Sequence, residues 1–90
     1  MIRKYELTLL LDATTSEAEL KNIDKMLKKW DKGAKLDETE IKLLAYPIGN
    51  HEKGRFVYYK LELNNEQSFG LGKELQNNEQ FLRYMMVAIK

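Results

Sequence analysis

Leu44-Ala45-Tyr46-Pro47-Ile48 is followed, after a short polar segment, by Gly54-Arg55-Phe56-Val57-Tyr58-Tyr59-Lys60-Leu61-Glu62-Leu63. Both stretches are rich in aromatic and aliphatic residues. This pattern predicts two strands joined by a flexible loop over residues 49–54, and we expect the hairpin to form the centre of a sheet. Pro47 lacks an amide donor, so it is expected at a strand end or a sheet edge.

The second strand of this hairpin alternates between two faces, as a strand with one buried side requires. The expected core face is Val57, Tyr59, Leu61 and Leu63, and the opposite face is Phe56, Tyr58, Lys60 and Glu62.

The N-terminal half predicts a strand and a helix. Residues 2–11 alternate, with Tyr5, Leu7, Leu9 and Leu11 on one side. Ser16 and Glu19 fit a capping box at a helix start, and Gly33 is expected to end that helix in a left-handed conformation. The helix has apolar positions every three or four residues, at Leu20, Ile23, Leu27 and Trp30.

The remaining chain predicts three elements. Residues 35–48 form the second strand, and Asn64 or Asn65 caps a second helix that ends near Gln76. Its apolar stripe is weak, because Phe69 and Leu75 are six residues apart. Gly70 and Gly72 each also cost about 1 kcal/mol relative to alanine inside a helix. Residues 81–89 predict a last strand, with Tyr84, Met86 and Ala88 opposite Met85, Val87 and Ile89.

The predicted order is strand, helix, strand, strand, helix, strand. Two such halves joined by a hairpin make a ferredoxin-like α+β fold, with a four-stranded antiparallel sheet and both helices on one face. Ninety residues allow a single domain over 1–90. The bare face of the sheet is expected to carry Lys4, Glu6, Thr8, Phe56, Tyr58, Lys60 and Glu62.

Composition narrows the class of protein. The chain has no cysteine, and its longest apolar run, Leu9 to Leu11, is too short to cross a bilayer. No signal-peptide pattern is present at the N-terminus, so we expect a cytoplasmic protein that does not span a membrane. The sequence contains no glycine-rich phosphate loop or metal-ligand set, so we expect no cofactor. The net charge of +1 means that any nucleic-acid binding depends on local clusters of basic residues.

Catalytic and metal-binding patterns are absent from the sequence. His51 is the single histidine and is expected to be a solvated loop residue. Asp37, Glu38 and Glu40 could hold a hard cation only with the help of loop carbonyls, and a solvated strand entrance is the better interpretation. We therefore expect neither an enzyme nor a metal site.

Two features bear on RNA. Residues 53–59 partly match the first ribonucleoprotein motif of RNA-recognition domains, so Phe56 and Tyr58 could stack on bases. The favoured interpretation is that they face a protein partner or cover the sheet. Arg3 and Lys4 could share the margin of the sheet with Arg83 or Lys90 and clamp phosphates. Scattered solubilising lysines are an equally good explanation of the basic residues.

Four stretches of the chain, in order, resemble the bacterial small-subunit ribosomal protein S6 family: residues 3–6, 44–48, 54–63 and 78–87. Leu-Ala-Tyr-Pro-Ile is the most specific of them. The resemblance implies a ferredoxin-like fold, no enzymatic activity, and binding to the central domain of small-subunit rRNA together with ribosomal protein S18. It also implies association with the ribosome in the cytoplasm.

The resemblance further implies roles for particular residues. Arg3, Tyr5, Tyr58 and Arg83 match positions expected to touch RNA, and the second strand is expected to face the partner through Lys42, Leu44, Tyr46 and Ile48. Glu40 stands where the family usually has glycine, which alters the local bend, and the polar tail of many relatives is missing after Lys90.

Two rival functions remain on the same fold. A stand-alone RNA-recognition module would bind single-stranded RNA through Phe56 and Tyr58 without a partner. An acylphosphatase-like hydrolase would need an anion-binding loop with a positioned arginine, and the sequence lacks one.

Overall fold

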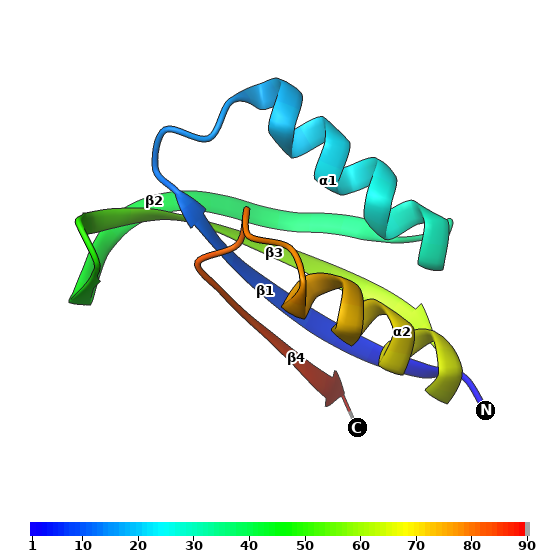
Figure 1. The fold of residues 1–90 in the computed structure, drawn as a ribbon. Coiled ribbons are helices and arrows are strands. Elements are labelled where there is room, and N and C mark those ends of the chain that lie inside the picture. The colour runs from blue at the N-terminus through cyan, green and yellow to red at the C-terminus, as the bar shows by residue number, and fades with distance from the viewer. Residues whose placement is uncertain (90) are drawn as a thin grey trace.

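The structure is a computed structural model that describes residues 1–89. Figure 1 shows its helices and strands in the predicted order. They are β1 (Arg3–Asp12), α1 (Glu17–Trp30), β2 (Lys35–Ile48), β3 (His51–Leu63), α2 (Asn65–Gln76) and β4 (Arg83–Ile89). The ferredoxin-like prediction is confirmed.

The sheet has the strand order β2-β3-β1-β4, and each neighbouring pair is antiparallel. β1 and β3 are therefore central, and the expectation that the whole β2–β3 hairpin occupies the centre is wrong. β2 lies at one edge because only β3 pairs with it. This place suits Pro47, which leaves no amide unpaired in the middle of the sheet.

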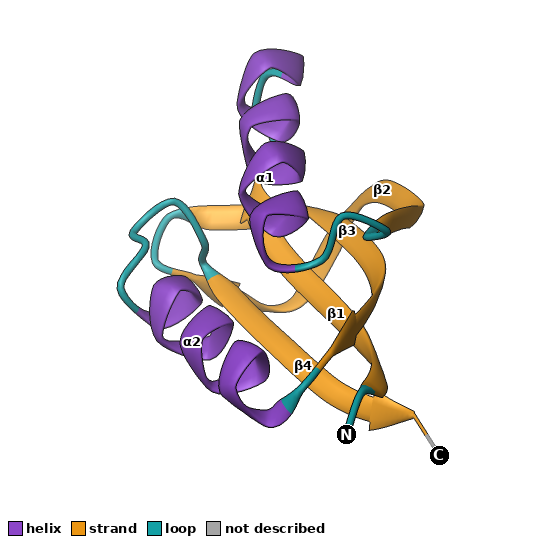
Figure 2. Ribbon diagram, turned by 90° about the vertical axis from the view of Figure 1, so that its right-hand side faces the viewer, coloured by secondary structure: helices purple, strands orange, loops and turns teal. Residues whose placement is uncertain are grey.

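The core lies on one face of the sheet only. In β3 the residues Val57, Tyr59, Leu61 and Leu63 are buried, as the alternation predicts. They pack in one cluster with the odd-numbered leucines of β1 and with Ile23 and Leu27 of α1 and Leu71 and Leu75 of α2. Figure 2 shows the two helices beside this face of the sheet. The other face is therefore the one left without helices in the described chain.

The connection between β2 and β3 is shorter than expected. The strands continue to Ile48 and from His51, and a turn at Gly49 and Asn50 joins them. Gly49 has a φ of 57°, a conformation that glycine adopts without a steric penalty. Gly54 is buried inside β3 and contacts the Leu10 side chain, so the predicted loop over 49–54 is wrong.

The helix ends confirm some capping predictions and correct others. Ser16 accepts a hydrogen bond from the Glu19 amide at 3.2 Å, and Asn64 forms a complete capping box with Gln67. The Glu19 carboxylate accepts a hydrogen bond from the Gln80 side-chain amide at 3.5 Å, and not from the Ser16 backbone amide as the predicted capping box requires. Gly33 is not left-handed, because Asp31 ends α1 in an extended conformation and its carboxylate accepts from the Gly33 amide.

The contact between α1 and α2 explains the glycine in the second helix. A Cβ atom at Gly70 would lie 2.7 Å from the Trp30 ring, so only glycine allows this approach. The Trp30 Nε1–H donates to Glu74 at 3.1 Å, which ties the helices together. Phe69, which the sequence places in the buried stripe, is 67% exposed and lies beneath the Lys73 ammonium.

Candidate nucleic-acid interface

The helix-free face of the sheet, called the open face below, carries its side chains in rows that cross the strands. One row runs from Glu40 through Phe56 and Leu10 to Arg83, and the next from Glu38 through Tyr58 and Thr8 to Met85. These rows follow from the register, because directly paired residues in antiparallel strands point to the same side. The predicted positions of Thr8, Phe56 and Tyr58 on this face are confirmed.

The aromatic pair on the open face is held by charged neighbours. The Phe56 and Tyr58 rings are nearly parallel, at 13°, with centroids 6.4 Å apart. Glu40 accepts from the Tyr58 hydroxyl at 2.9 Å and pairs with the Lys42 ammonium at 3.0 Å. That ammonium also lies 4.8 Å from the Phe56 ring centroid. Both aromatic side chains therefore already have partners within the protein.

The ionised forms of Glu40 and Lys42 stabilise each other. The hydrogen bond from Lys42 and then that from Tyr58 lower the pKa of the Glu40 carboxyl. The bond to Glu40 raises the pKa of Lys42 in return, while burial and the same carboxylate raise the pKa of Tyr58. At neutral pH the site thus holds an ion pair, a neutral phenol and an aromatic ring.

The centre of the open face, beside β2, is acidic. A cavity of about 180 Å³ next to Tyr58 is lined by carboxylates together with one lysine: Glu6, Asp37, Glu38, Glu40 and Lys60. Carboxylates repel phosphates, so a nucleic-acid backbone is disfavoured over this part of the sheet. The part of the open face without this cluster of carboxylates, and thus more compatible with a nucleic-acid backbone, is formed by β1 and β4.

The residues predicted to touch RNA do not lie together. Tyr58 and Arg83 are on the open face, whereas Tyr5 is half-buried against the core on the helix side. Arg3 pairs with Leu63 at one end of the sheet, and Arg83 pairs with Leu10 near the other. Seven residues of an extended strand separate the two positions, which is about 23 Å. The prediction that both arginines share one margin is therefore wrong, and Lys90 lies outside the described residues.

A hollow lies beside Arg83 that the sequence did not predict. It measures about 330 Å³ and is lined by Thr8, Leu10, Phe56, Arg83, Tyr84 and Met85. Arg83 is exposed, and its guanidinium has no ion-pair partner in the part of the chain that the structure describes. The alternation of residues 83–89 is the signal that could have shown Arg83 and Met85 on one face.

The residues predicted to face a protein partner have different settings. Lys42 is engaged by Glu40, and Leu44 is half-buried beside Gly54. Tyr46 is 86% exposed, and Ile48 closes the hairpin opposite His51. Of these four side chains, Tyr46 is therefore the one most open to a partner.

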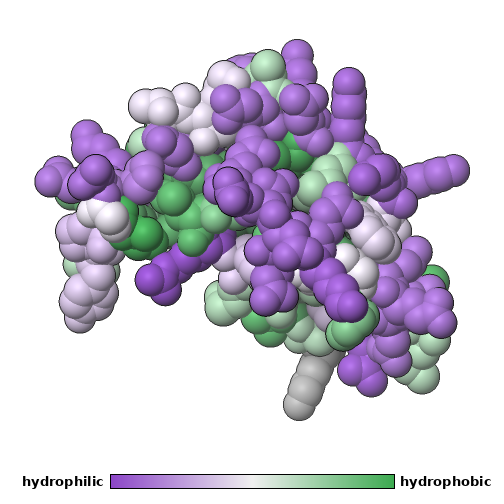
Figure 3. All heavy atoms as spheres, viewed as in Figure 1, coloured by the Kyte–Doolittle hydropathy of each residue, from purple (hydrophilic) through white to green (hydrophobic). Residues whose placement is uncertain are grey.

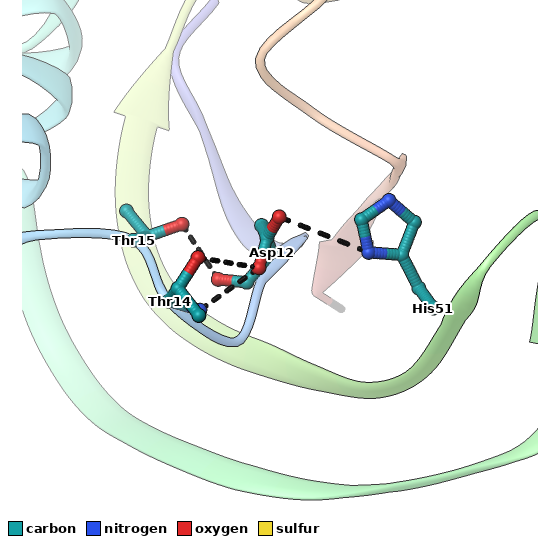
Figure 4. A network of polar contacts seen from close by, with 4 residues as sticks. All are labelled: Asp12, Thr14, Thr15 and His51. Atoms are coloured by element: carbon teal, nitrogen blue, oxygen red, sulfur yellow. Dashed lines mark hydrogen bonds and ion pairs between the residues drawn. The ribbon is translucent and has the colours of Figure 1, made fainter.

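Figure 4 shows a polar network that the sequence did not reveal. His51 Nδ1 lies 3.8 Å from Asp12 Oδ2, and Asp12 Oδ1 accepts from both the amide and the hydroxyl of Thr14. These bonds, led by that from the Thr14 amide, lower the pKa of Asp12. The Thr14 hydroxyl donates to the carboxylate rather than to the imidazole, so His51 does not activate it as a nucleophile. The network stabilises the turn after β1.

A larger hollow lies on the opposite, helix-covered side. Figure 3 shows apolar atoms beneath α1 framed by hydrophilic ones. The cavity measures about 410 Å³, and Leu20, Ile23, Leu36 and Val57 supply its apolar lining. Arg55 also lines it and donates to the Thr39 hydroxyl at 3.3 Å. Its place between α1 and β2 separates it from the open face.

Among residues 1–89, no group of three histidine, cysteine or acidic side chains is placed to hold a metal ion. The described helices include none that is long and apolar enough to span a bilayer.

The protein has a ferredoxin-like α+β fold, in which two helices cover one face of a four-stranded antiparallel sheet. The open face carries both aromatic and charged side chains. The family model described as "Ribosomal protein S6" matches residues 4–88. The chain belongs to the ribosomal protein S6 family.

Two relatives in this family are similar to this chain along nearly their whole length. The small ribosomal subunit protein bS6 of Phytoplasma australiense is 28% identical, with 96% of this chain and 98% of that protein covered. The bS6 protein of Thermus thermophilus is 27% identical, with 96% and 90% covered. These relatives support a structural role in the ribosome.

Two solved structures have the same fold. That of 30S ribosomal protein S6 from Thermotoga maritima has a TM-score of 0.77 at 18% identity, covering 99% of this chain and 89% of that one. An uncharacterized protein from the same organism has a TM-score of 0.61 at 17% identity, with both chains fully covered. The fold is thus shared with a protein that has no assigned function.

Proposed function

We propose that this protein is a structural, non-catalytic component of the small ribosomal subunit in the cytoplasm. In that role it binds the central domain of small-subunit rRNA together with ribosomal protein S18. The observation that carries the proposal is the family match over residues 4–88, which includes every helix and nearly every strand residue. A near-neutral protein can fill this role by making a few phosphate contacts while its partners supply most of the positive charge.

The RNA contacts we propose are Arg3, Tyr5, Tyr58 and Arg83. Arg3 and Arg83 are exposed and can each reach a phosphate, but at separate ends of the sheet. Tyr58 has to exchange its bond with Glu40 for one with RNA, and the carboxylates around it oppose a close phosphate. Arg83 is therefore the strongest of the four positions, since an apolar hollow beside it can receive a base or sugar.

We place ribosomal protein S18 along β2, at Lys42, Leu44, Tyr46 and Ile48. Two apolar side chains in this part of the hairpin are exposed and support the placement: Leu43 is 71% exposed and Tyr46 is 86% exposed. Exposed aromatic and aliphatic side chains that lie close together commonly mark protein interfaces.

The test is the sedimentation of the tagged protein from lysate at moderate salt. We expect it to travel with small-subunit particles and to bind a central-domain rRNA fragment more tightly when ribosomal protein S18 is present. Sedimentation only with free RNA or free protein would contradict the proposal.

A stand-alone module for single-stranded RNA is the second candidate, favoured by the parallel rings of Phe56 and Tyr58 on the open face. It predicts tight binding of a short unpaired RNA without a partner protein, and loss of that binding in Phe56→Ala. The partners that both rings already have within the protein argue against it.

A further inference from the structure

The two free edges of the sheet differ in how well they are protected against pairing with another strand. An edge strand exposes unpaired backbone donors and acceptors, and charged side chains, bulges and prolines normally prevent other strands from adding to it. β2 and β4 are the edge strands here.

β2 has all three forms of protection. Five of the eight residues from 35 to 42 are charged, the register shifts between Leu36 and Glu38, and Pro47 lies near the end of the strand. A second strand approaching this edge would meet carboxylates and lysines over residues 35–42 and the proline near its end.

β4 has none of these protections over residues 84–89. This segment reads Tyr-Met-Met-Val-Ala-Ile, without a charge or a proline, and no register shift interrupts its pairing with β1. Three of its side chains form an exposed apolar column on the open face: Met85, Val87 and Ile89 are 60%, 49% and 39% exposed. Figure 1 shows β4 at the margin of the sheet.

This edge is also complementary to itself. If two copies of β4 lie antiparallel about a two-fold axis at Met86, Met85 of one copy faces Val87 of the other on the open face. Arg83 then faces Ile89, and on the helix side Tyr84 faces Ala88. Among residues 83–89 no like charges meet, and each apolar side chain of the column gains a neighbour across the axis.

We propose that a second copy of this chain occupies the β4 edge, so that unassembled protein forms a two-fold dimer with a continuous eight-stranded sheet. The contact is restricted to a seven-residue strand, which is small for a specific interface. The dimer is accordingly weak, with a dissociation constant on the order of 0.1–1 mM.

Sedimentation equilibrium of the intact protein over a range that brackets this constant tests the proposal. We expect reversible dimerisation, with concentration-dependent amide shifts in residues 83–89. Met85→Lys should weaken the dimer at least tenfold, because it places a charge in the apolar contact without touching the core. Leu43→Lys is the matched control, since Leu43 is also an exposed apolar residue of an edge strand but lies on β2.

A charge exchange tests the register. Met85→Lys and Val87→Glu should each dimerise poorly alone, and a mixture of the two should associate, because the introduced lysine and glutamate face each other across the axis. A monomer at every concentration, dimerisation lost in Leu43→Lys but kept in Met85→Lys, or no rescue in the mixture would each overturn the proposal.

Discussion

Tyr59 links the core to the surface of α1. Its side chain is 3% exposed, and its hydroxyl donates to Asp24 Oδ1 at 2.7 Å. This hydrogen bond is the main reason that the pKa of Asp24 lies below its usual value of 3.8, with a smaller effect from Lys28. Burial raises the pKa of the Tyr59 phenol well above its usual value, so it remains a donor throughout the neutral range.

We expect Tyr59→Phe to lower the free energy of unfolding by about 1–2 kcal/mol at neutral pH, because it removes a hydrogen bond to a charged group. A lowered carboxyl pKa stabilises the fold above the unfolded-state pKa, and that stabilisation is lost as pH falls through the folded-state value. The difference between the two proteins should therefore shrink in acid. Urea denaturation of both proteins at neutral pH and at a pH below the folded-state pKa of Asp24 measures this difference, with Tyr84→Phe as the control. A difference that does not change with pH would contradict this account.

Gly54 is required by space rather than by backbone conformation. A Cβ atom there would collide with Leu10 Cδ1 and lie 3.4 Å from the Leu11 carbonyl oxygen. We expect Gly54→Ala to destabilise the protein by about 1–3 kcal/mol, the usual cost of overpacking. Gly33→Ala has only a 3.4 Å contact with the Asp31 carboxylate and should cost less. Thermal unfolding of both variants decides the point, and equal losses would exclude the packing explanation.

At the scale of elements, α2 is docked on α1 through Trp30. The Trp30 carbonyl accepts from Gln67 at 3.1 Å, and its indole N–H donates to Glu74. The ring lies directly over Gly70, so the glycine that weakens α2 as an isolated helix also permits its closest contact with α1.

The two helical glycines should respond in opposite directions to alanine. Gly72→Ala meets no atom within 4 Å and should stabilise the protein by about 0.5–1 kcal/mol through helix propensity. Gly70→Ala collides with the Trp30 ring at 2.7 and 2.8 Å and should destabilise it. Chemical denaturation of the pair provides the comparison. A gain in stability for both variants would show that the helices can move apart without cost.

For the whole molecule, the separation of the exposed arginines shapes any RNA contact. The long dimension of the protein is 40 Å, and Arg3 and Arg83 lie toward different ends of the sheet. The acidic cavity beside β2 disfavours a continuous track of phosphates across the open face. The geometry therefore suits two separate phosphate contacts.

Arg3→Ala and Arg83→Ala should each reduce the slope of log K against log salt for rRNA binding by about one, as expected for one lost phosphate contact. The double variant should lose about two, because distant sites act additively. Lys25→Ala, an exposed cation on α1, is the matched control and should leave the slope unchanged. Filter binding with the rRNA fragment and ribosomal protein S18 provides the measurement. An unchanged slope in either arginine variant would remove that residue from the interface.

The amino-acid sequence by itself determined the order of the six elements, the core face of β1 and β3, and the cap at Ser16. These features depend on alternation and spacing among near neighbours, which a local pattern records directly. Only the tertiary structure decided that β2 lies at the sheet edge, that Gly54 and Gly70 are contact sites, that His51 meets Asp12, and that Arg3 and Arg83 are far apart. Those relations join residues distant in the chain, and strand order and register set their distances, which local periodicity does not encode.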